Sequence, residues 1–193
     1  MIMGRRTEVF QKGSVFHIYN RGCNKSKIFF EKDNYIFLIK KVKKYSKEFN
    51  VSVIAYCLMP NHYHFVLRQN SEIELNKCVQ NIFNSYTKAI NKRYKRSGTL
   101  FEGKFKANEI YEDTTVLEIC RYVHRNPLEA GLVKNLEDWQ YSNYPEWIGL
   151  RDGDLYDEEV IVKNFSNPYD YKKYVLDYYS TKKMLKELEK YVK

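Results

Sequence analysis

The chain has 193 residues, of which 44% are hydrophobic and 16% aromatic, and this composition predicts a folded protein and excludes a disordered one. Its net charge of +9 favours a polyanionic partner, either a nucleic acid or an acidic membrane surface. No apolar run approaches the roughly 18 residues of a membrane span. The four cysteines form no C-x-x-C pair, which predicts reduced thiols, so we expect a cytoplasmic protein without a membrane segment.

The first 70 residues predict three strands and one helix. Residues 15–19 alternate well enough to form a strand, and apolar side chains within 33–48 recur at helical spacing. Residues 51–59 and 62–68 predict a hairpin, because Pro60 and Asn61 between them favour a tight turn.

The next segments complete one α/β unit. The sequence Ser71-Glu72-Ile73-Glu74 predicts a capping box that opens a second helix, and 107–111 predicts a short strand. A third helix, capped by Asp113 or Thr114, is expected to run to about Asn126 and to stop at Pro127. The order strand–helix–strand–strand–helix–strand predicts an α+β ferredoxin-like sandwich with an antiparallel sheet, followed by the third helix.

The composition shifts after Pro145. We therefore expect a catalytic domain over 1–145 and an appendage over 146–193. The appendage would comprise an acidic loop at 151–159 and an amphipathic helix at about 170–192 that packs on the domain or on a partner.

His62 and His64 are candidate metal ligands. Side chains alternate along a strand, so both imidazoles would lie on one face, close enough to share one divalent ion. The alternative is a pair of half-buried histidines on an ordinary strand, since His-x-His alone is a weak motif.

Tyr122 and Asn126 are four residues apart on the third helix, so they stack on one of its faces. They lie beside the apolar stripe and could face the same cavity as the histidines. This set suits attack of a tyrosine on a phosphodiester, because a metal ion can assist a phenol whose pKa is near 10. Alternatively, Tyr122 packs sideways and Asn126 caps the helix before Pro127.

Residues 88–106 combine cations with aromatic side chains, a composition typical of surfaces that bind phosphates and stack on unpaired bases. A solvated helix face is the alternative. The candidate DNA contacts are Asn20, Arg21, Lys92, Arg93, Lys95, Arg96, Lys104, Lys106, Arg121 and Arg125.

Other tyrosines and histidines have competing roles. Tyr86 lies on the apolar stripe of the second helix, which favours core packing. Tyr94 lies among cations and could stack on a base or pack beneath them. His17 and His124 could support a metal site or lie on the surface, and we assign them no chemistry.

Five segments resemble the HUH superfamily of single-tyrosine transposases, in the branch of REP-associated tyrosine transposases. Together they cover roughly residues 15–145, in the order found in that family. They are 19–22 (YNRG), 55–67 (AYCLMPNHYHFVL), 97–107 (SGTLFEGKFKA), 122–133 (YVHRNPLEAGLV) and, more weakly, 139–144.

The resemblance implies a role for each candidate. His62 and His64 would be the metal ligands, Tyr122 the nucleophile, and Asn126 the polar residue that completes the metal site, where relatives often have glutamine. The implied activity is that of a metal-dependent single-strand DNA endonuclease and strand transferase. It would act on hairpin-forming DNA through a 5′-phosphotyrosine intermediate, with Mg²⁺ or Mn²⁺ as the ion.

Alternatives remain open. The chain could be a domesticated hairpin-binding protein that keeps the fold and the charge but no longer cuts. A replication initiator or relaxase fits less well, because no matching tyrosine pair or helicase domain is present. We expect a monomer or a homodimer, cytoplasmic and associated with the nucleoid when bound to DNA.

Overall fold

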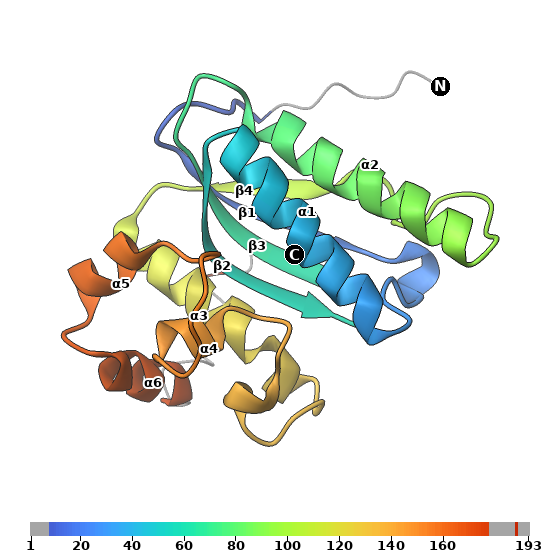
Figure 1. Ribbon diagram of the computed structural model, residues 1–193. Coiled ribbons are helices and arrows are strands. Elements are labelled where there is room, and N and C mark those ends of the chain that lie inside the picture. The colour runs from blue at the N-terminus through green and yellow to red at the C-terminus, as the bar shows by residue number, and fades with distance from the viewer. Residues whose placement is uncertain (1–7, 178–187, 189–193) are drawn as a thin grey trace.

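The computed structural model describes residues 8–177 and 188 (Figure 1). Within this part of the chain, one sheet has the strands β1 (Val15–Arg21), β2 (Val51–Met59), β3 (His62–Gln69) and β4 (Lys106–Ile110). Their order is β2-β3-β1-β4, and every neighbouring pair is antiparallel. Helix α1 (Lys32–Glu48) joins β1 to β2, and helix α2 (Leu75–Arg93) joins β3 to β4. The predicted ferredoxin-like sandwich is therefore confirmed.

Strand β1 ends two residues later than predicted, and Gly22 follows it at once. A Cβ atom on Gly22 would lie 2.0 Å from the carbonyl oxygen of Ser26, so the backbone here leaves room for glycine alone. This close approach fixes the end of β1 beside the turn between β2 and β3, where the Gly22 N–H donates to the Asn61 carbonyl oxygen at 2.8 Å.

The predicted capping box at the start of α2 is wrong. Glu74 is the N-cap residue but its side chain makes no cap hydrogen bond. The Ser71 hydroxyl instead accepts the N–H of Ile73, in the turn that precedes the helix. The first free N–H of the helix, on Leu75, is bound at 2.8 Å by the side-chain oxygen of Gln69 from the end of β3. A residue of the preceding strand, outside the capping-box motif, therefore supplies the cap.

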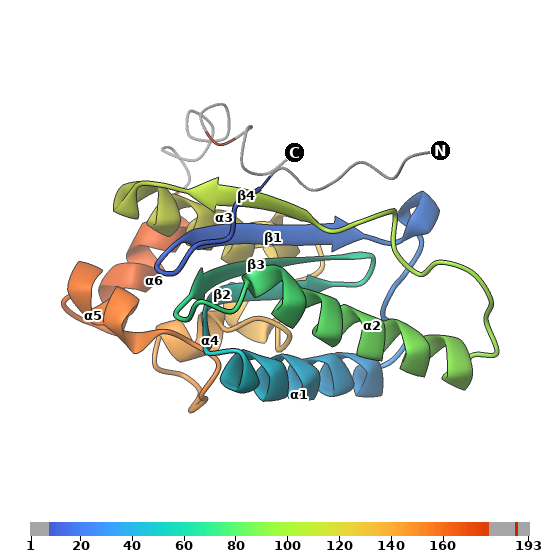
Figure 2. The same ribbon diagram turned by 90° about the horizontal axis from the view of Figure 1, so that it is seen from above.

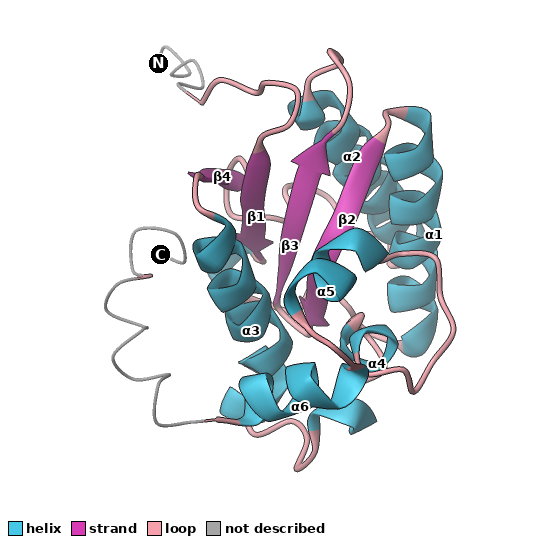
Figure 3. Ribbon diagram, turned by 90° about the vertical axis from the view of Figure 1, so that its left-hand side faces the viewer, coloured by secondary structure: helices cyan, strands magenta, loops and turns pink. Residues whose placement is uncertain are grey.

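Helices cover both faces of the sheet. Figures 1 and 2 show α1 and α2 side by side on one face, where they bury Phe16, Ile18 and Phe65 of the sheet in a first apolar core. Figure 3 shows helix α3 (Asp113–Glu129) against the opposite face, where it forms a second core with residues such as Val66. Side chains of successive strand residues therefore enter different cores.

Helix α3 continues past Pro127, which corrects the prediction that it stops there. Proline removes one N–H donor but does not prevent the turn that follows it from staying helical. The helix ends where Gly131, with φ +66°, donates to the Leu128 carbonyl oxygen while Leu132 donates to that of Pro127. This pair of bonds is a Schellman motif, in which glycine accepts the left-handed conformation. Asn126 therefore lies within the helix.

Short elements complete the described chain. They are η1 (Cys23–Lys25), η2 (Leu136–Asp138), α4 (Tyr144–Trp147), α5 (Glu158–Asn164) and α6 (Pro168–Leu176). The predicted helix over 170–192 is wrong as a continuous element, because α6 ends at Leu176 and Asp177 is extended. Apart from residue 188, the remainder of the predicted helix lies outside the described residues.

Helix α6 packs on the second core. Tyr171 and Val175 are fully buried there, together with Ile119 of α3 and Trp147 of α4. Helix α4 crosses residue 145, and the division of the chain at that residue stays a prediction. Over residues 8–177 and 188, no helix combines the length and the apolar character that crossing a membrane requires.

Candidate active site

A cavity of about 660 Å³ lies at the end of the sheet face that α3 covers. The antiparallel register of β1 and β3 pairs Tyr19 with His64 and Arg21 with His62, so all four side chains leave the same face. Tyr122 of α3 also lines this cavity. The structure therefore brings the predicted histidines and the predicted tyrosine together.

His62 faces an amide oxygen at each ring nitrogen. Nδ1 lies 2.7 Å from Asn61 Oδ1, and Nε2 lies 3.4 Å from Asn126 Oδ1. The side-chain nitrogen of Asn61 donates to the Lys25 carbonyl oxygen, and that of Asn126 donates to the Tyr122 carbonyl oxygen. These bonds fix both side-chain amides with the oxygen towards His62. Burial lowers the pKa of His62, and the contact with Asn126 opposes this effect only in part, which favours the neutral ring with a single N–H.

A neutral His62 cannot donate to both oxygens. We assign the proton to the shorter contact with Asn61, and in that tautomer the lone pair of Nε2 opposes the oxygen of Asn126. A cation held by both atoms would remove the conflict, and the 3.4 Å between them is short enough for one ion to contact both. The donor set of His62 and Asn126 therefore fits a divalent ion.

His64 is oriented by His17, a residue to which sequence reasoning assigned no role. His17 Nε2 lies 3.0 Å from His64 Nδ1, and the rings stack with 14° between their planes. If His64 donates from Nδ1, its Nε2 keeps the lone pair that a metal ion needs. Burial, and then the neighbouring His17 and His62, hold the pKa of His64 well below its usual range, so the ring is neutral.

Tyr122 stands edge-on to His64, with 5.4 Å between ring centroids and 83° between ring planes. Burial raises the pKa of Tyr122, and a side-chain hydrogen bond with Asn126 opposes this effect. The hydroxyl is therefore protonated at neutral pH and needs assistance to act as a nucleophile.

Few described side chains near this cavity are typical metal ligands. Among the described residues, no three or more His, Cys, Asp and Glu side chains form a group that could hold a metal ion. A site built from His62, His64 and Asn126 contains an amide in place of a carboxylate. Their convergence is observed, whereas their roles stay predictions.

The alternative tyrosines lie elsewhere. The hydroxyl of Tyr86 is buried and donates to the Ile28 carbonyl oxygen, while that of Tyr94 contacts Glu31 and Asn34 at the start of α1. Both lie on the side of the sheet away from the histidines. The second tyrosine in the cavity is Tyr19, which strand alternation could have identified.

Two predicted DNA contacts are wrong. Arg121 and Arg125 are only 1% and 4% exposed, because their guanidinium groups face α6 and its C-terminal end. Arg121 donates to the Asp177 carbonyl oxygen, and Arg125 donates to that of Val175 at 2.8 Å. They stabilise the packing of α6 on α3 and do not form a DNA surface.

Other predicted contacts surround the cavity. Lys106 lines it and places its ammonium 5.7 Å from the ring centroid of Tyr19. Asn20 and Arg21 also line it, but Arg21 forms an ion pair with Glu102, an acid that sequence reasoning did not single out. Lys104 is exposed on the same loop. These side chains make the rim of the cavity mixed in charge.

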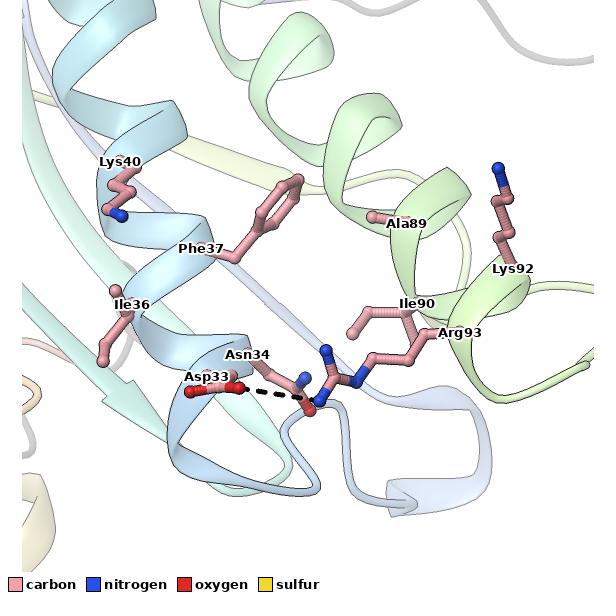
Figure 4. A pocket seen from close by; sticks show the side chains of 9 residues that line it. All are labelled: Asp33, Asn34, Ile36, Phe37, Lys40, Ala89, Ile90, Lys92 and Arg93. Atoms are coloured by element: carbon pink, nitrogen blue, oxygen red, sulfur yellow. Dashed lines mark ion pairs between the residues drawn. The ribbon is translucent and has the colours of Figure 1, made fainter.

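The remaining predicted contacts lie at the end of α2 and just beyond it, away from the cavity. Figure 4 shows a groove of about 650 Å³ between α1 and α2, with Lys92 and Arg93 on its α2 side. Arg93 pairs with Asp33 there, which reduces its availability to phosphates. Lys95 is exposed, and Arg96 lies over the ring of Phe30. DNA contact by these four residues stays a prediction.

Known proteins resemble this chain over the same region. The family described as "Transposase IS200 like" matches residues 11–126. A Haemophilus influenzae protein assigned as a REP-associated tyrosine transposase is 24% identical over 114 residues, which cover 53% of this chain and 64% of that protein, less than two thirds of its length. A solved structure of a REP-associated tyrosine transposase bound to a REP hairpin has a TM-score of 0.64 at 20% identity, covering 80% of this chain and 94% of that one, which shows a shared fold.

The family match includes all of β1 to β4 and each of the converging residues His62, His64, Tyr122 and Asn126. It covers more than half of the 193 residues. The chain therefore belongs to the IS200-like transposase family.

Proposed function

We propose that this transposase is a metal-dependent single-strand DNA endonuclease and strand transferase. The observation that carries the proposal is the convergence of His62, His64 and Tyr122 at one cavity, with Asn126 Oδ1 3.4 Å from Nε2 of His62. Hairpin-forming DNA is the proposed substrate, because a relative with the same fold was solved bound to a REP hairpin.

His62, His64 and Asn126 would hold the ion, and we propose Mg²⁺ or Mn²⁺. Two imidazoles favour Mn²⁺, whereas Mg²⁺ prefers oxygen ligands. When bound, the ion would polarise the scissile phosphate and stabilise the negative charge that develops on it. His17 would act as a positioning residue, since it fixes which nitrogen of His64 is free.

Tyr122 performs the covalent step in this proposal. Its hydroxyl oxygen bonds to phosphorus and its proton passes to solvent, while the bond from phosphorus to the 3′-oxygen breaks and that oxygen takes up a proton. The products are a 5′-phosphotyrosine and a free 3′-hydroxyl. A 3′-hydroxyl at a new junction can reverse the reaction, which releases Tyr122 and joins the strands.

A monomer would suffice for this chemistry. Tyr122 lies 5.4 Å, centroid to centroid, from His64 of the same chain, so one chain supplies both the tyrosine and the ligands.

The test is formation of a covalent adduct with labelled single-stranded DNA hairpins in the presence of Mn²⁺. Wild type should give a DNA-linked band that survives denaturing electrophoresis. Tyr122→Phe should give none while binding the same DNA with similar affinity, since it loses only the hydroxyl. Tyr19→Phe is the matched control from the same cavity and should keep the adduct. Binding without an adduct in wild type would overturn the proposal in favour of a non-cleaving hairpin-binding protein.

A further inference from the structure

A second cavity, of about 490 Å³, lies between α2 and the loop that leads to β4. It is separate from the groove of Figure 4 and opens on the sheet side that α1 and α2 cover. Its volume falls in the range of pockets that bind small organic groups. Among the described residues that line it, Lys104 alone is charged.

One wall is a row of carboxamides on α2. Asn76, Gln80 and Asn84 are four residues apart and so lie on successive turns of one helix face. Gln80 and Asn84 are exposed, and the buried Oδ1 of Asn76 has no hydrogen-bond partner. A carboxamide carries a donor and an acceptor side by side, the arrangement that pairs with the edge of a nucleobase.

Three phenylalanines line the same cavity. Phe101 and Phe105 of the loop are half-buried, and Phe83 of α2 stands edge-on to Phe101 at 5.4 Å between centroids. Aromatic rings stack on unpaired bases, whereas phosphates are bound by cations. The lining therefore suits a base and not a phosphate.

The second cavity adjoins the active-site cavity. Asn20 lines both of them. The loop between them is fixed to the end of β1, because the Cys23 N–H donates to the Leu100 carbonyl oxygen and the Glu102 N–H donates to that of Arg21. Figure 2 shows the chain between α2 and β4 passing beside the end of β1. A DNA strand that passes the end of β1 would therefore reach both cavities.

We propose that this cavity recognises one unpaired nucleobase close to the cleaved phosphodiester. Gln80 and Asn84 would pair with the edge of the base, and Phe105 would stack on its face. The inference rests on the proposed function and adds the part of the protein that selects the DNA sequence.

The probe is a pool of DNA stem-loops with randomised single-stranded arms on both sides. Wild type should enrich one base at one arm position, and removing that base to leave an abasic site should weaken binding by about 10- to 100-fold. The double variant Gln80→Ala/Asn84→Ala should lose this enrichment and bind the intact and abasic DNAs alike. Asn81→Ala removes an exposed carboxamide that donates to the carbonyl oxygen of Lys77 on the same helix, so it should behave as wild type.

The outcomes separate the two proposals. If the double variant melts at the same temperature as wild type and still enriches the same base, the proposed base site is overturned, even if Tyr122 still forms its adduct. The base site is also overturned if wild type forms the adduct but enriches no base at any arm position. Failure of wild type to bind any stem-loop would overturn both proposals.

Discussion

Replacing His124 with glutamine should remove a pH dependence of stability that wild type shows below neutral pH. His124 lies on α3 and is 1% exposed. Its Nδ1 lies 2.6 Å from the Tyr171 hydroxyl and its Nε2 lies 2.9 Å from Asn143 Oδ1. The amide nitrogen of Asn143 donates to the carbonyl oxygens of Ile54 and Leu155, so its oxygen must accept from His124. The neutral imidazole satisfies both contacts, and a second proton would disturb the contact with Tyr171.

The size of this loss of stability follows from the pKa of His124. Burial lowers the pKa of His124 from 6.5 to about 4. Above pH 6.5 the ring is neutral in both folded and unfolded states, so the folded state bears no penalty there. As the pH falls from 6.5 towards 4, only the unfolded state takes up the proton, and stability falls. Each pKa unit is worth about 1.4 kcal/mol, so the loss totals about 3 kcal/mol, a large part of the 5–15 kcal/mol typical of a domain.

The assay is urea unfolding, followed by circular dichroism, at several pH values from 7 to 4 for wild type and His124→Gln. At pH 7 wild type should be the more stable, because the variant loses buried hydrogen bonds. Other titrating groups are common to both proteins, so the difference between them reports His124. That difference should shrink by about 3 kcal/mol as the pH falls. A difference that stays constant with pH would refute the assignment of a neutral, buried His124.

Three further outcomes are expected. His62→Ala should abolish metal-dependent adduct formation but keep hairpin binding, and an unchanged adduct on the denaturing gel would exclude His62 as a ligand. His17→Phe should weaken Mn²⁺ binding by about 10- to 100-fold, measured by titration calorimetry, because His64 loses the hydrogen bond that orients it; an unchanged affinity would contradict the positioning role. Replacing Lys104 and Lys106 with alanine should reduce the slope of log K against log salt by about 0.7 for each lost phosphate contact, and an unchanged slope would show that neither lysine contacts DNA.

Strand alternation allowed much of the site to be predicted. The pattern of 62–67 places both histidines on one face of β3, and the same reasoning places His17 and Tyr19 together on one face of β1. What the pattern could not supply is the pairing of β1 with β3, which sets His17 against His64. A register between strands separated by a helix depends on the whole fold, not on either strand alone.

Local rules failed where a nearby residue outside the expected motif took over its role. The capping box at Ser71 was a sound expectation from the sequence, but Gln69 reaches Leu75 from the end of β3. The sequence predicts a stop at Pro127, yet Gly131 offers the stronger end signal in the same segment. Because the helix continues, Asn126 lies within it, four residues after Tyr122, and its side-chain amide donates to the Tyr122 carbonyl oxygen.

The two arginines whose predicted DNA contacts are wrong each lie one residue before a residue of the predicted active site. Arg121 and Arg125 form one stripe of α3, and Tyr122 and Asn126 form the next, about 100° around the axis. Helix α6 covers the arginine stripe, whereas the tyrosine stripe faces the histidines. From the sequence both stripes lie beside the apolar core, and only the docking of α6 decides which one is open. The segment predicted as an appendage thus determines which face of α3 is available for chemistry, and the arginines are the groups that hold it there.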